Sequence, residues 1–118
     1  SQHAGIEALR GTKETINDIK KEFHKRKNFV HSKLNELEKI SCFEPGGAFY
    51  AFPNISKSGM SAQKFADIAL EEKGVALVPG TSFGDSAENF VRISYANSME
   101  NLEKAIYRLS AIWKKLKL

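Results

Sequence analysis

The sequence Asn89-Phe90-Val91-Arg92-Ile93-Ser94-Tyr95-Ala96 is an apolar run typical of a β-strand, and it contains a single arginine. Side chains alternate between the two faces of a strand, so Val91, Ile93 and Tyr95 are expected to share one face. That face is expected to be buried against the core of the protein. The other face carries the intervening residues, and among these Arg92 is the main candidate for a functional role.

A guanidinium is a planar fork that can donate two parallel hydrogen bonds to a carboxylate, which a lysine ammonium cannot reproduce. Arg92 is therefore a candidate for binding the carboxylate of a ligand. The alternative is structural, because an arginine on a half-exposed strand commonly pairs with a neighbouring acid or reaches water. The strand alone leaves both interpretations open.

A long amphipathic helix is predicted from about Thr12 to Ile40, where apolar residues recur at spacings of three, four and seven. These residues are Ile16, Ile19, Phe23, Val30, Leu34 and Leu37. Gly11 is expected to separate this helix from a short leading helix that carries Ile6 and Leu9. A leading turn of this kind is marginal without something to pack against, so this end is expected to belong to a larger body.

Three short strands and two further helices are expected after residue 47. The strands are residues 48–52, which Pro53 terminates, residues 75–78, and the arginine strand. Ser61 is expected to cap a helix that Gly74 ends, and Ser98 to cap the last helix. The apolar stripe of that last helix is Leu102, Ala105, Ile106, Leu109, Ile112, Trp113 and Leu116. We therefore predict an α+β fold, with a three-stranded, mostly antiparallel sheet, helices packed on one face, and residues 1–118 forming a single domain.

Composition excludes several classes of protein. The chain has 118 residues, 42% of them hydrophobic, and a formal charge of +4, and its basic residues are mixed with acids as on a solvated helix face. We therefore expect no nucleic-acid partner. No apolar run approaches the roughly 20 residues that span a bilayer, so no membrane association is expected. The single cysteine, Cys42, favours a reducing compartment such as the cytoplasm and is expected to be an inert packing residue.

Other chemistries find little support in the sequence. The loop from Gly80 to Gly84 lacks the Gly-Lys-Ser/Thr ending of a phosphate-binding loop and lies between strands. His24 and His31 are too far apart for a helical zinc pair, and no metal site is expected. The loop glycines are expected to allow positive φ around Phe83, and Phe83 to pack rather than to contact a substrate.

Three motifs follow one another in an order and spacing that resemble a known family. They are Pro45-Gly46-Gly47-Ala48-Phe49-Tyr50, Val78-Pro79-Gly80-Thr81-Ser82-Phe83-Gly84 and Arg92-Ile93-Ser94-Tyr95-Ala96. Together they resemble the C-terminal small domain of a class I aminotransferase, the aspartate aminotransferase-like branch of the fold-type I pyridoxal phosphate enzymes. The resemblance implies that Arg92 receives the α-carboxylate of an amino-acid substrate. It also implies that Gly80, Phe83 and Gly84 lie near the mouth of the active site.

The same resemblance implies pyridoxal phosphate as cofactor, an aspartate-like amino acid and a 2-oxo acid as substrates, and a homodimer. Such an enzyme needs a lysine that binds the cofactor, an acid on the pyridine nitrogen and a phosphate cup. No matching segment is present, so the large cofactor-binding domain is expected to be missing, no catalytic residue is assigned, and the chain alone is expected to be inactive. The alternative is a free-standing α+β interaction module that uses its basic long helix.

Overall fold

The computed structural model describes residues 1–115, with side chains described for residues 1–112. Within this range the chain is an α+β protein, as predicted, and no described helix is long and apolar enough to cross a membrane. Its elements are α1 (Gln2–Arg10), α2 (Lys13–Asn35), β1 (Tyr50–Ala51), η1 (Ser56–Ser58), α3 (Ala62–Lys73), β2 (Val78–Pro79), η2 (Gly80–Phe83), η3 (Asp85–Ala87), β3 (Val91–Ser94) and α4 (Met99–Lys115).

The arginine strand β3 is the central strand of the sheet. The strand order is β1-β3-β2, and both pairs are antiparallel. Ala51 of β1 lies opposite Ile93, and Val78 of β2 lies opposite Arg92. Hydrogen bonding on both edges leaves β3 little freedom to shift register, because a slip of one residue would turn its apolar face toward solvent.

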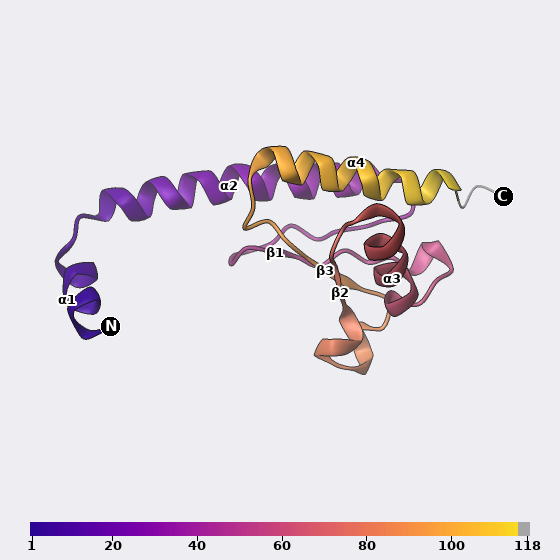
Figure 1. Ribbon diagram of the computed structural model, residues 1–118, viewed down its shortest axis with the longest axis horizontal. Coiled ribbons are helices and arrows are strands. Elements are labelled where there is room, and N and C mark those ends of the chain that lie inside the picture. The colour runs from indigo at the N-terminus through magenta and orange to yellow at the C-terminus, as the bar shows by residue number, and fades with distance from the viewer. Residues whose placement is uncertain (116–118) are drawn as a thin grey trace.

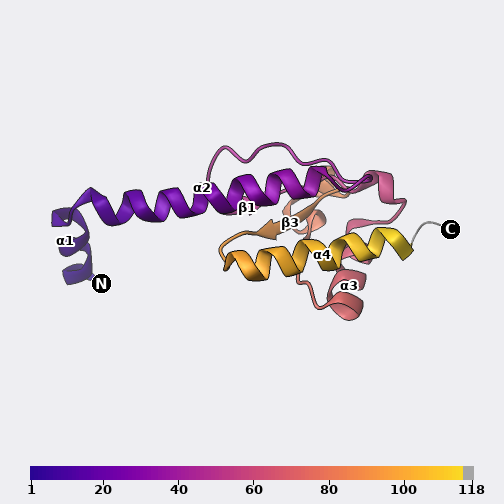
Figure 2. The same cartoon turned by 90° about the horizontal axis from the view of Figure 1, so that it is seen from above.

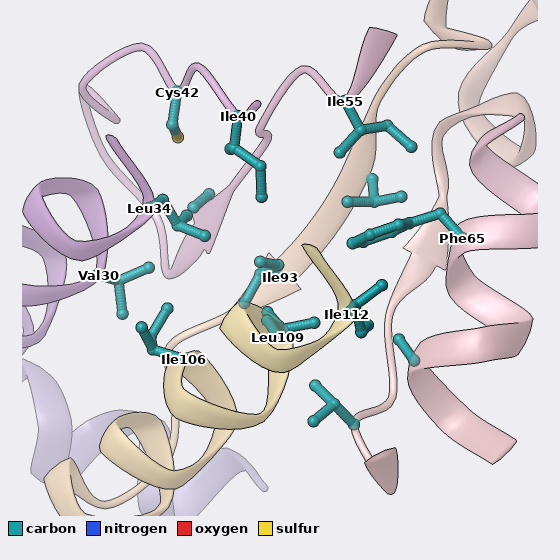
Figure 3. Packing of buried hydrophobic residues seen from close by; sticks show 14 of the residues in the cluster. Val30, Leu34, Ile40, Cys42, Ile55, Phe65, Ile93, Ile106, Leu109 and Ile112 are labelled. Carbon is teal, nitrogen blue, oxygen red and sulfur yellow. The ribbon is translucent and has the colours of Figure 1, made fainter. Parts of the chain in front are cut away.

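Helices cover one face of this sheet. Figure 1 shows α2 and α4 above the strands, and in the view from above they run side by side, with α3 beyond α4 (Figure 2). Val91, Ile93 and Tyr95 of the covered face are at most 7% exposed, which confirms the predicted alternation. Figure 3 shows Ile93 pointing toward Leu109 of α4, within a core to which all three main helices contribute.

The predicted caps are confirmed. Ser61 accepts a hydrogen bond from the backbone N–H of Lys64, and Ser98 accepts one from the backbone N–H of Asn101. Gly74 ends α3 in the left-handed conformation. The described part of the α4 stripe packs into the core as expected, whereas Leu116 and the side chain of Trp113 lie outside the described residues.

The helix α2 ends at Asn35, five residues before the predicted end. The Asn35 side chain donates to the carbonyl of Cys42 and accepts from its backbone N–H, at 2.9 and 3.0 Å. Asparagine competes with helical hydrogen bonding in this way, and here it closes the turn that brings residue 42 back to the helix. Leu37 and Ile40 still pack in the core, but from that turn rather than from the helix.

The two outer strands are shorter than predicted. Ala48 has φ of +57°, a left-handed conformation that a strand does not contain, so β1 begins only at Tyr50. Val75 was expected to begin a strand, but its backbone N–H bonds to the carbonyl of Ala69 at the end of α3. This bond belongs to the Gly74 helix stop, so β2 starts later, at Val78.

Tyr95 connects the end of β3 to the turn before β1. Its side chain is buried, and its hydroxyl donates to the carbonyl of Ala48 at 3.1 Å. Burial raises the pKa of the Tyr95 phenol, and the charge of Lys27 partly opposes that rise. Tyr95 therefore packs, as predicted, and also holds the left-handed residue in place.

We expect Tyr95→Phe to lower the free energy of unfolding by about 1 kcal/mol at pH 7, because the Ala48 carbonyl loses its donor. A raised pKa means that the folded state holds the phenol proton more tightly than the unfolded chain does. This stabilisation is complete below the unfolded pKa of about 10 and is lost as the pH rises through the folded pKa. The stability difference between wild type and Tyr95→Phe, measured by urea unfolding, should therefore shrink above pH 10. A difference that grows there would contradict this assignment.

Candidate functional site

Arg92 lies in the middle of β3, on the face of the sheet opposite the helix-covered core. Its neighbours Val91 and Ile93 are buried in that core, so the backbone on both sides is held by packing as well as by hydrogen bonds. Arg92 itself is partly exposed. The strand thus presents one guanidinium from a fixed backbone position, as the sequence predicts.

Two aromatic rings contact this guanidinium. Its Cζ atom lies 4.3 Å from the ring centroid of Tyr50 and 4.8 Å from that of Phe83. Tyr50 belongs to β1 and Phe83 to η2, which directly follows β2, so the rings come from opposite sides of the central strand. A cation over an aromatic face is attracted by the ring quadrupole. Phe83 thus packs on Arg92 and remains partly exposed.

No acid neutralises Arg92 within the described side chains. The ion pairs found there join other cations to acids, for example Arg26 to Glu22 at 2.9 Å and Lys27 to Glu44 at 2.6 Å. One part of the structural alternative for Arg92, pairing with a neighbouring acid, is therefore not what residues 1–112 show. A guanidinium held by rings alone keeps all of its N–H donors available to a carboxylate.

An aromatic cluster extends from Phe83 across the same face. Phe83 meets Phe52 edge to face at 6.0 Å, and Phe52 stacks on Phe90 at 5.2 Å with the rings nearly parallel. Sequence reasoning did not assign Phe52 or Tyr50 to the site. The signal was nevertheless present, since Tyr50 and Phe52 are two residues apart and alternation places them on one face.

The loop that carries Phe83 depends on Gly80. A Cβ atom on Gly80 would lie 2.7 Å from the carbonyl oxygen of Phe90 and closer still to that of Ala87. Gly80 is therefore required for close backbone approach, which corrects the expectation that it supplies positive φ. Gly84 does have positive φ, +133°, as predicted.

Gly80→Ala should lower the free energy of unfolding by about 2 kcal/mol, because the added methyl group overlaps backbone oxygens that cannot rotate away. The matched control is Gly46→Ala, where nothing lies within 4 Å of the added atom and φ is not positive. The control should stay within about 0.5 kcal/mol of wild type. Chemical denaturation of the two variants measures the difference, and equal stabilities would show that η2 is not tightly packed.

The other sequence candidates are not brought together as a site. Within the described residues, no group of three or more His, Cys, Asp or Glu side chains could hold a metal ion. Cys42 is buried, and that burial raises the pKa of its thiol, so it is a poor nucleophile at neutral pH. Gly47 lies at a bend before β1 with open space around it, so no close approach of another segment requires a glycine there.

Comparison with known proteins identifies the family. The family model for aminotransferase class I and II matches residues 1–109, so the chain belongs to this family. An aspartate aminotransferase of Pyrococcus horikoshii is 46% identical over 110 residues, which cover 92% of this chain and 28% of the relative. Aromatic-amino-acid aminotransferase 2 of Thermococcus litoralis is 38% identical over 119 residues, covering 99% of this chain and 30% of the relative.

Solved structures agree with the sequence comparison. The structure of an aromatic aminotransferase from Pyrococcus horikoshii matches with a TM-score of 0.93 at 38% identity, over 98% of this chain and 31% of that one. The chain thus spans less than a third of the length of these relatives. The α+β fold and the recognised family are both confirmed.

The family implies pyridoxal phosphate, but the described residues do not form a site for it by themselves. No Lys, Arg, His, Asp or Glu side chain is buried among them, so they contain neither a buried lysine to bind the cofactor nor a buried acid to meet a pyridine nitrogen. What the described face does offer is Arg92, a group that can bind the anionic end of a substrate.

Proposed function

We propose that this chain is the C-terminal small domain of a pyridoxal phosphate-dependent aminotransferase. The full-length enzyme would move an amino group between an aspartate-like amino acid and a 2-oxo acid. Arg92 would bind the α-carboxylate that both substrates share, with Gly80, Phe83 and Gly84 forming a loop at the mouth of the site. The cofactor and its lysine would belong to the large domain, so the chain alone would be inactive.

One observation supports this role above all: the Arg92 guanidinium is held by two rings and pairs with no acid among the described side chains. A cation with its donors unpaired on a fixed strand suits a ligand carboxylate. The named relatives differ in substrate, aspartate for one and aromatic amino acids for another. The α-carboxylate is common to both, and it is the part of the substrate that the proposal assigns to Arg92.

The N-terminal third of the chain supports the proposal of a missing large domain. Figure 1 shows α1 and the first half of α2 extending away from the sheet. No residue of α1 is buried, and the buried residues of α2 are only Val30 and Leu34, near its C-terminal end. The predicted apolar stripe is therefore only half covered. The large apolar residues left exposed on these helices are Ile6, Leu9, Ile16 and Ile19.

In the 118-residue chain on its own, the amides of residues 2–19 should exchange with solvent nearly as fast as those of an unstructured peptide, because helices without packing are marginal in water. In the full-length protein the same amides should be protected. Hydrogen–deuterium exchange measures both, with residues 102–109 of α4 as a control that is protected in each. Fast exchange of residues 2–19 in the full-length protein would contradict a covering domain.

Arg92→Lys in the full-length enzyme should raise KM for the amino acid and for the oxo acid alike, by roughly 10- to 100-fold, because a lysine cannot replace the bidentate contact. Steady-state kinetics with both substrates measures the effect. The matched control is Arg26→Lys, since Arg26 also lies over a ring, that of Phe23, but is paired with Glu22. Unchanged KM values for Arg92→Lys would remove Arg92 from the site.

The alternative, a free-standing interaction module that uses the basic helix, has less support. Several cations of α2 are already engaged by acids, among them Lys21 by Asp18, Lys27 by Glu44 and Lys33 by Glu36. The family match covers nearly the whole chain. We therefore propose an enzyme rather than an interaction module. The proposed homodimer comes from the family resemblance, and the proposed cytoplasmic location comes from the single cysteine.

A further inference from the structure

An arginine side chain has many rotamers, and ordering one of them costs conformational entropy. An acid on the same protein commonly supplies the ordering contact, but such an acid would also occupy the donors that a ligand needs. Arg92 is contacted by two rings instead, and within residues 1–112 no acid pairs with it. Rings attract the cation without accepting its in-plane hydrogen bonds.

The two rings are themselves held by separate parts of the fold. Tyr50 is fixed in β1, which pairs with β3, and its ring packs on that of Phe49 at 4.4 Å. Phe83 is 51% exposed, but its position is set by the close approach at Gly80 and by the edge of Phe52. The guanidinium thus lies against two rings, and each ring is held by contacts that do not involve Arg92.

We propose that Tyr50 and Phe83 are positioning residues that hold the Arg92 guanidinium in one orientation, with its N–H groups free to donate to the substrate carboxylate. This inference rests on the proposed function, since it concerns the substrate anion that Arg92 binds. It goes further by assigning the orientation of that guanidinium to two rings that accept none of its in-plane hydrogen bonds.

The physical reason lies in the match between two planar groups. The two oxygens of a carboxylate and the paired N–H groups of an arginine can lie in one plane and form two parallel hydrogen bonds. A guanidinium that is already held in place loses less conformational entropy when the carboxylate binds. If the fork is free to turn, more entropy is lost on binding, and the substrate binds less tightly.

The test uses the full-length holoenzyme and four variants at the two ring positions. Tyr50→Leu and Phe83→Leu remove a ring, whereas Tyr50→Phe and Phe83→Tyr keep it. The ring-removing variants should raise KM for amino acid and oxo acid roughly three- to tenfold with a much smaller change in kcat. The ring-keeping variants should restore KM to within about twofold of wild type. A general loss of stability would not raise KM in the ring-removing variants and spare it in the ring-keeping variants.

Phe43→Leu is the matched control, because it makes the same change as Phe83→Leu at a ring that is 91% exposed and lies outside the aromatic cluster. Its KM should stay near that of wild type. The Arg92 contact is measured directly with 3-phenylpropionate, an inhibitor that carries one carboxylate and no amino group. Phe83→Leu should raise its inhibition constant roughly three- to tenfold, and Phe43→Leu should leave it near that of wild type.

Wild-type KM values in both ring-removing variants would overturn the proposal. An increase in KM for Phe43→Leu as large as that for Phe83→Leu would also overturn it. Arg92→Lys, measured in the same assay, distinguishes the proposed carboxylate-binding role of Arg92 from the positioning role of the two rings. If Arg92→Lys raises KM and the ring variants do not, only the positioning role fails; if Arg92→Lys has no effect, the proposed function fails.

Discussion

The pairing of β3 on both of its edges is the constraint on which the other features depend. It places a four-residue strand between β1 and β2, so that Val91 and Ile93 must face the helices while Arg92 faces away from them. Burial of the apolar face sets the register, since any slip would expose it. The same pairing brings Tyr50 from one side and the loop after β2 from the other, and the guanidinium environment follows from this arrangement.

The surroundings of Arg92 differ from those of the cations that are paired with acids. Elsewhere among the described side chains, cations such as Arg26 and Lys27 are paired with acids, and each pair lies on the helical side of the molecule or on the loop that crosses α2. At the sheet, aromatic rings take the place of the acid. A cluster of this kind can hold a cation in place while leaving its hydrogen-bond donors for a ligand, as the proposed role of Arg92 requires.

Much of the architecture was predictable because local rules agree with the tertiary packing. The caps at Ser61 and Ser98 and the glycine stop at Gly74 need only neighbouring backbone groups, so they can be read along the chain. The predicted bounds of α2 and β1 were wrong because a group outside each element intervened. The early end of α2 depends on a bond between Asn35 and Cys42, and the late start of β1 depends on Ala48, whose carbonyl is held by Tyr95.

The sequence by itself determined the α+β class, the alternation of β3 and the choice of Arg92, because periodicity and side-chain chemistry act over a few residues. Only the tertiary structure decided that Tyr50 and Phe83 lie on that guanidinium and that Gly80 is needed for close approach to the backbone near Phe90. These contacts join segments 9 to 42 residues apart, and such distances are set by how strands pair and loops pack. No local pattern of residues encodes them, so they appear only when the chain is folded.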